Sequence, residues 1–117
     1  ANAAEDAFVE INDRVKKLFM KVNPTATKVP DGQAAMNTVF SDNAPLVEFC
    51  DRSTETGSNI QKGYMQMLAG AMSALRNPKA HANITITKDD AMRRLMFASM
   101  LMYKIDEAID YSKIQER

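Results

Sequence analysis

His81 is the single histidine of the chain, and it follows Arg76 by five positions, with Asn77 and Pro78 between them. An imidazole titrates near neutral pH and can accept or donate a proton. A guanidinium keeps its charge and offers several N–H donors that match phosphate oxygens. Proline cannot continue a helix, so we expect both side chains to turn toward one point beside a helix end. This combination is suited to chemistry on a phosphate ester.

The same residues also have a purely structural interpretation. Arg76 has the position of a cation that stabilises a helix C-terminus. Asn77 and Pro78 are typical of a helix stop, and His81 is typical of a surface loop. The residues alone favour this structural interpretation, and the spacing from Arg to His does not exclude it.

Other kinds of catalytic site find little support in the sequence. One histidine and one cysteine do not supply a zinc site, and the acidic residues are scattered. Gly57 and Gly63 do not form a phosphate-binding loop, and no serine lies in a nucleophile elbow. We therefore expect no metal and no cofactor. Cys50 is the single cysteine, which excludes an internal disulfide and favours a reduced thiol in a cytoplasmic protein.

The bulk properties predict one globular domain over residues 1–117. Formal net charge is zero and the pI is about 6.8, so any contact with nucleic acid must come from a local basic patch. The longest apolar run, residues 95–103, is too short to cross a membrane. The chain begins with Ala1 rather than Met, which is consistent with the C-terminal domain of a longer protein.

Apolar spacing predicts four helices, over residues 3–21, 32–40, 60–75 and 88–112. We expect Asp31 to cap the second helix and Thr87 the fourth. A further helical turn is predicted at 46–50, a polar loop at 51–59 and an extended loop at 83–87. In the first helix, Phe8, Ile11, Val15 and Leu18 form the predicted core face, and the opposite face carries Asp6, Glu10, Asn12, Arg14 and Lys17. The pairs Lys16–Lys17 and Arg93–Arg94 are predicted to be solvated.

The fourth predicted helix is apolar on nearly every side between Leu95 and Tyr103. Such a helix must be covered on more than one side, either within its own chain or by a partner. The third helix carries small residues that allow close helix packing, namely Ala69, Gly70, Ala71, Ser73 and Ala74. We therefore predict a homodimer whose interface involves these two helices.

Residues 63–81, GYMQMLAGAMSALRNPKAH, look like the signature of the HEPN superfamily. That motif is an Arg, usually followed by a polar residue, and a His after four to six intervening residues. Arg76, Asn77 and His81 occupy these places. Residues 31–40 and 90–107 also resemble, more narrowly, the Ymh-like, abortive-infection-associated branch, so the resemblance covers most of the chain.

The resemblance implies an all-α, four- or five-helix up-and-down bundle that dimerises through its last two long helices. It further implies a metal-independent endoribonuclease of a phage-defence or toxin–antitoxin system. Arg76, Asn77 and His81 would be its catalytic residues, and we expect Ser73 and Lys79 to contact RNA. Expected partners are the RNA substrate, a second copy of the chain and a cognate antitoxin or other defence-system protein. The alternative is a non-catalytic module of a larger defence protein that binds nucleotides or proteins or that dimerises.

Overall fold

The computed structural model describes residues 3–76 and 86–116, and most of them are helical. Its helices are α1 (Ala3–Val22), α2 (Gln33–Val39), α3 (Glu55–Ala71) and α5 (Lys88–Ser112). The end of α3 continues into a π-helical turn, η1 (Met72–Arg76). The described part of the chain contains no β-strand. The all-α prediction is therefore confirmed.

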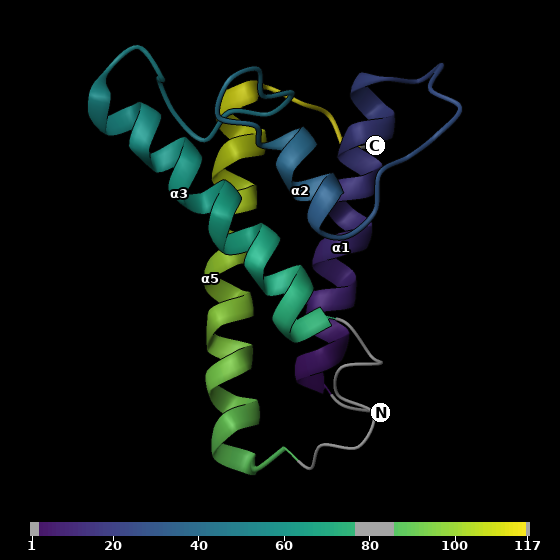
Figure 1. Ribbon diagram of the computed structural model, residues 1–117, viewed down its shortest axis with the longest axis vertical. Helices are drawn as coiled ribbons and strands as arrows, with labels where there is room; N and C mark the ends of the chain where they lie inside the picture. Colours follow the sequence, from purple (N-terminus) through teal and green to yellow (C-terminus); the bar gives the residue numbers. More distant parts are fainter. Residues whose placement is uncertain (1–2, 77–85, 117) are drawn as a thin grey trace.

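Helices α1 and α5 lie side by side and run in the same direction (Figure 1). The ring centroids of Phe8 and Phe97 are 6.2 Å apart, and further along both helices Arg14 pairs with Asp106. Helix α3 runs the opposite way and crosses in front of them in Figure 1. The helix directions thus do not alternate throughout, as an up-and-down bundle would require. The reason is the loop of residues 23–32, which returns the chain along α1 so that α2 runs in the same direction as α1 (Figure 1).

The core lies where α1, α2, α3 and α5 meet, and the predicted apolar face of α1 points into it. Phe8, Ile11, Val15 and Leu18 are all buried, which confirms that prediction. Helix α5 contributes every third or fourth residue to the same core, as expected for one buried helix face. The other fully buried large side chains include Met36, Phe40, Leu68, Met72, Leu101 and Ile105.

The start of α3 and the segment of residues 46–50 differ from the prediction. Helix α3 begins at Glu55, within the expected polar loop, because the Thr54 side chain caps it by accepting a hydrogen bond from the Gly57 amide at 3.0 Å. The predicted helical turn at 46–50 is wrong. That segment is irregular, and buried Gln61 supplies hydrogen bonds to its backbone in place of a helix.

The two predicted helix caps have opposite outcomes. Thr87 caps α5 by accepting a hydrogen bond from the Asp90 amide at 3.1 Å, as expected. Asp31 does not cap α2. The N-cap is Gly32, which has a φ of 59° and makes no side-chain cap bond. The Asp31 carboxylate is instead directed to side chains of α1 and η1.

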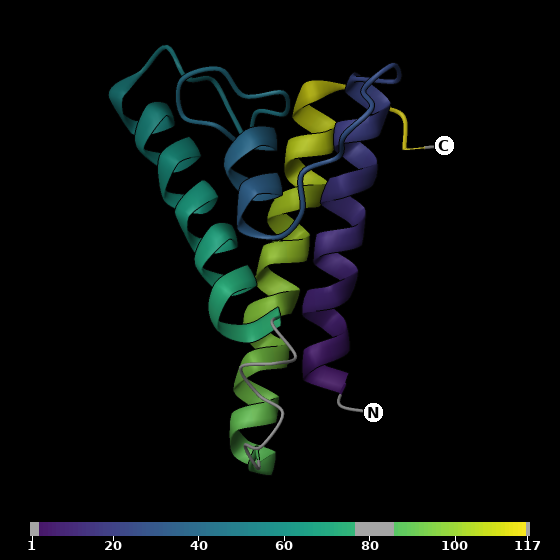
Figure 2. The same cartoon turned by 45° about the vertical axis from the view of Figure 1, so that its right-hand side comes forward.

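Helix α5 leaves one apolar side uncovered within this chain. Its first turns project beyond the ends of α1 and α3 (Figures 1 and 2). Met92, Met96, Met100 and Tyr103 are 59%, 66%, 41% and 62% exposed. The expected cover on several sides is therefore not supplied by the described residues of a single chain. None of the described helices is both long and apolar enough to span a membrane.

Candidate functional site around Arg76

The predicted site begins at η1, which ends at Arg76. Short π-helical turns are rare and are frequently found at functional sites. Ser73 and Arg76 both belong to this turn. The remaining predicted residues, Asn77, Lys79 and His81, lie outside the described residues, as does most of the predicted extended loop at 83–87.

The Arg76 guanidinium lies directly against the backbone before α2. Its Nη2 donates to Asp31 Oδ2 at 3.3 Å, and its side chain is 25% exposed. A Cβ atom on Gly32 would be 2.6 Å from the same nitrogen, so only glycine permits this approach. Arg76 Nε is buried and has no hydrogen-bond partner within the described part of the chain. The side chain is thus held in place by its contacts with Asp31 and Gly32.

Asp31 joins Arg76 to helix α1. Its Oδ1 accepts a hydrogen bond from Asn12 Nδ2 at 2.9 Å and lies 3.2 Å from Lys16 Nζ. The pKa of Asp31 is lowered. The largest cause is the Asn12 hydrogen bond, burial opposes it as the next largest, and the Lys16 hydrogen bond and the charge of Arg76 lower the pKa further. The carboxylate therefore stays charged between two cations.

Asn12 anchors this arrangement from inside the fold. It is only 3% exposed, and its Oδ1 accepts a hydrogen bond from the Gly32 amide at 2.9 Å. The prediction that Asn12 lies on the outer face of α1 is wrong, since the loop of residues 23–32 returns over it. Lys16 was predicted to be solvated, but it is half-buried and paired with Asp31.

Ser73 contacts the same segment from one turn earlier in η1. Its hydroxyl donates to Gln33 Oε1 at 3.2 Å. Two predicted site residues, Ser73 and Arg76, are therefore both placed against residues 31–33. Asp31, Asn12 and Lys16 were not expected from the sequence to belong to this group. The one local signal was the Asp31–Gly32 pair, since glycine often marks a place where another group approaches the backbone closely.

A second charged group lies away from Arg76, between α1 and the C-terminal tail. Arg14 donates to Asp106 at 2.6 Å and to Glu116 at 3.0 Å, and the Glu116 hydrogen bond is the main cause of its raised pKa. An open depression of about 400 Å³ beside it is lined by Glu10, Asp13, Arg14, Lys17 and Glu116. Neither Ser73 nor Arg76, the two predicted site residues that the structure describes, lines this depression.

Cys50 has the surroundings of a structural thiol. Burial raises its pKa, which is opposite to the shift that activates a cysteine nucleophile. Its Sγ donates to the Gly57 carbonyl at 3.7 Å. In the part of the chain that the structure describes, no three cysteine, histidine, aspartate or glutamate side chains are grouped closely enough to hold a metal ion.

Residues 1–105 match the family model described as "Protein of unknown function (Hypoth_ymh)". The match covers most of the chain, and the protein therefore belongs to the Hypoth_Ymh family. No curated protein and no solved structure matches it. The family description names no activity, so the relation to HEPN proteins and the ribonuclease activity stay predictions.

Proposed function

We propose that this protein is a metal-independent endoribonuclease of a phage-defence or toxin–antitoxin system. The observation that carries the proposal is the placement of Arg76 at the last residue of a π-helical turn, five positions before the single histidine. Its guanidinium is held by contacts with Asp31 and Gly32. A cation fixed in this way is suited to stabilising charge on a reacting phosphate.

In the proposed reaction, the ribose 2′-oxygen attacks the neighbouring phosphorus while His81 accepts the 2′-hydroxyl proton. The bond from phosphorus to the 5′-oxygen breaks, and an imidazole of a second subunit donates a proton to that oxygen. Arg76 stabilises the negative charge that develops on the phosphoryl oxygens, and Asn77 orients His81 or the phosphate. The products are a 2′,3′-cyclic phosphate and a 5′-hydroxyl.

The test is cleavage of mixed RNA by the purified protein in excess EDTA. His81→Ala should abolish cleavage, and Arg76→Gln should slow it about 10²–10³-fold, the usual effect of losing one donor to a transition-state oxyanion. Lys62→Gln is a matched control, because Lys62 is an exposed cation of α3. An RNA with one deoxynucleotide at the cut position should resist cleavage there. Cleavage of that substrate at the full rate, or loss of cleavage in EDTA, would refute the mechanism.

The alternative, a non-catalytic binding module, is favoured by one specific observation. A carboxylate already contacts the Arg76 guanidinium, as in an ordinary structural ion pair. Under this alternative, wild type and His81→Ala leave RNA equally intact. The two candidates are therefore separated by the same EDTA experiment.

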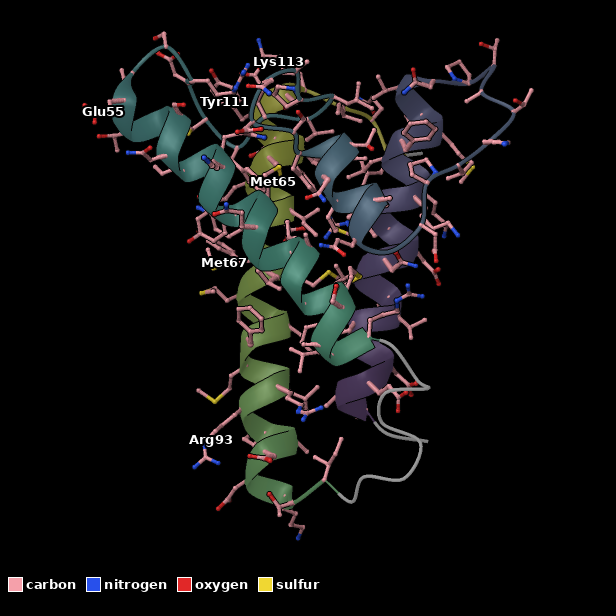
Figure 3. The ribbon with its side chains drawn as sticks, viewed as in Figure 1. Glu55, Met65, Met67, Arg93, Tyr111 and Lys113 are labelled. Atoms are coloured by element: carbon pink, nitrogen blue, oxygen red, sulfur yellow. The ribbon has the colours of Figure 1, made fainter. Side chains whose placement is uncertain are left out.

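The proposed active form is a homodimer that pairs the exposed side of α5. Met92, Met96, Met100 and Tyr103 follow one another at spacings of four, four and three, so they form one stripe along the helix. We name these four residues the α5 stripe. Figure 3 shows Arg93, beside this stripe, pointing away from the other helices. An exposed apolar stripe of this length is typical of an interaction surface.

Charge favours a second copy of the chain as the occupant of the α5 stripe. The N-terminal half of α5 carries Lys88, Arg93 and Arg94 against Asp89 and Asp90, a net charge of +1, whereas its C-terminal half carries Lys104 against Asp106, Glu107 and Asp110, a net charge of −2. Antiparallel pairing about a twofold axis near Met100 brings the basic half of each helix against the acidic half of the other. The same pairing places Met96 opposite Tyr103 of the partner subunit, and sulfur–aromatic contacts of this kind are favourable.

Sedimentation at micromolar concentration tests this dimer. The wild type should sediment as twice the 13.0 kDa chain mass, and Met96→Glu should shift it to the monomer because a buried unpaired charge is costly. Met20→Glu is the control, since Met20 is 43% exposed on α1 and outside the α5 stripe. A wild type that sediments as a monomer would contradict the proposal.

A further inference from the structure

Three charged side chains from three different elements meet at the end of η1. Lys16 comes from α1, Asp31 from the loop before α2, and Arg76 from η1. Lys16 Nζ is 3.2 Å from Asp31 Oδ1, and Arg76 Nη2 is 3.3 Å from Asp31 Oδ2. Each cation therefore contacts a different oxygen of one carboxylate. Together the three groups carry one excess positive charge.

The contacts around Asp31 differ from those that Arg14 makes with Asp106 and Glu116. Arg14 is matched by two carboxylates at 2.6 and 3.0 Å, so that group carries an excess negative charge. Around Asp31 the contacts are longer, at 3.2 and 3.3 Å, whereas exposure does not separate the two groups, since the Asp31, Asp106 and Glu116 side chains are 53%, 60% and 41% exposed. Such half-exposed pairs are weak, because water replaces the lost contact at little cost. Lys16 and Arg76 each make one such contact with Asp31, whereas Arg14 makes three hydrogen bonds to Asp106 and Glu116, so less is lost when Asp31 leaves its two cations.

We infer that Lys16 and Arg76 form a two-cation binding site for an RNA phosphodiester, and that the Asp31 carboxylate occupies this site in the free protein. A phosphodiester has two non-bridging oxygens, which can accept from Lys16 and Arg76 as the two oxygens of Asp31 do. Guanidinium and ammonium groups are the usual partners of backbone phosphates. The choice of RNA rests on the proposed function, whereas the site itself rests on the contacts above.

Occupation of the site by Asp31 has a direct consequence for affinity. A phosphate must displace the carboxylate, so removal of its charge should strengthen binding. Asparagine keeps the shape of the side chain and an oxygen that can accept from Asn12. Asp31→Asn thus removes the competing charge and leaves the loop anchored to α1.

The experiment measures binding of the full chain to a fluorescein-labelled, uncleavable 2′-O-methyl RNA by anisotropy at several KCl concentrations. Lys16→Gln should weaken binding about twofold to fivefold, as expected for one half-exposed ionic contact. It should also reduce the slope of log K against log salt by about 0.7, the value for one phosphate contact on a single strand. Asp31→Asn should tighten binding by a similar factor. Thermal melting confirms that each variant is folded.

Matched controls separate a local effect from one of net charge. Lys17→Gln removes an exposed cation from the next position of α1, and Glu55→Gln removes an exposed carboxylate at the far end of α3 (Figure 3). Both should leave the affinity within twofold of wild type, a bound set by the small size of exposed charge effects. Equal effects of Lys16→Gln and Lys17→Gln, or weaker binding by Asp31→Asn, would overturn the inference. The absence of any binding by the wild type would also overturn it.

Failure here is distinguishable from failure of the proposed function. A protein that cleaves RNA but binds it independently of Lys16 and Asp31 retains the function and loses this site. If the variants bind the uncleavable RNA with the expected order of affinities but the wild type cuts no RNA, the binding site is supported and the proposed function is refuted.

Discussion

Replacement of Gly32 by alanine perturbs both the fold and the position of Arg76. The residue has a φ of 59° and a ψ of −130°, a sparsely populated combination that favours glycine and costs an L-amino acid about 1–3 kcal/mol. The new methyl group would also be 2.6 Å from Arg76 Nη2, so the guanidinium must move. The Asp31 pair is then lost, which adds about 0.2–1 kcal/mol. We expect the free energy of unfolding to fall by about 1–4 kcal/mol.

The assay is urea denaturation at equilibrium, with Gly63→Ala as the matched substitution. Gly63 lies within α3, and a Cβ atom there meets no other atom within 4 Å. Alanine is the better helix former, so Gly63→Ala should stabilise the protein by about 0.5–1 kcal/mol. A glycine-to-alanine substitution is thus expected to lower the free energy of unfolding at position 32 and to raise it at position 63.

Two results would refute the reasoning about Gly32. One is a Gly32→Ala protein as stable as the wild type, which would mean that neither the backbone conformation nor the contact with Arg76 matters. The other is a destabilised Gly32→Ala protein that binds 2′-O-methyl RNA as tightly as the wild type. In that case the position of Arg76 would have no role in binding.

Three further predictions concern other parts of the molecule. Gln61→Met should lower the free energy of unfolding by about 3–6 kcal/mol, because buried Gln61 accepts a hydrogen bond from the Phe49 amide and donates to the carbonyls of Phe40 and Val47. Urea denaturation measures this loss against the exposed control Gln66→Met. Equal stability of the two variants would contradict the prediction. Cys50→Ser should retain RNA cleavage and fold, since burial raises the pKa of the thiol, and a folded but inactive variant would show that the site is misplaced. The stability that Asp31 contributes should be complete above its ordinary pKa of 3.8 and disappear as the pH falls through its lower folded pKa. The wild type should therefore exceed Asp31→Asn in stability at neutral pH and approach it in acid, and a difference that is constant with pH would refute this.

The sequence alone determined the parts of the fold that depend on neighbours along the chain. Apolar spacing predicted α1 and α5 almost to the residue, together with the buried face of α1. The Thr87 cap was also predictable, because a hydroxyl bonds to an amide three residues later. These features were accessible because helix periodicity and capping are local.

Only the tertiary structure decided the partners of the polar side chains. The prediction placed Asn12 on the surface, Asp31 at a helix cap and Gln61 within a helix. Each of the three side chains forms a hydrogen bond with a segment distant in sequence. Sequence patterns show that a residue is polar, but the group that satisfies it depends on the path of a returning loop. The environment of Arg76 was hidden for the same reason. Its contacts come from a segment 45 residues away, which lies there because the packing of α1, α2 and α3 brings it against η1.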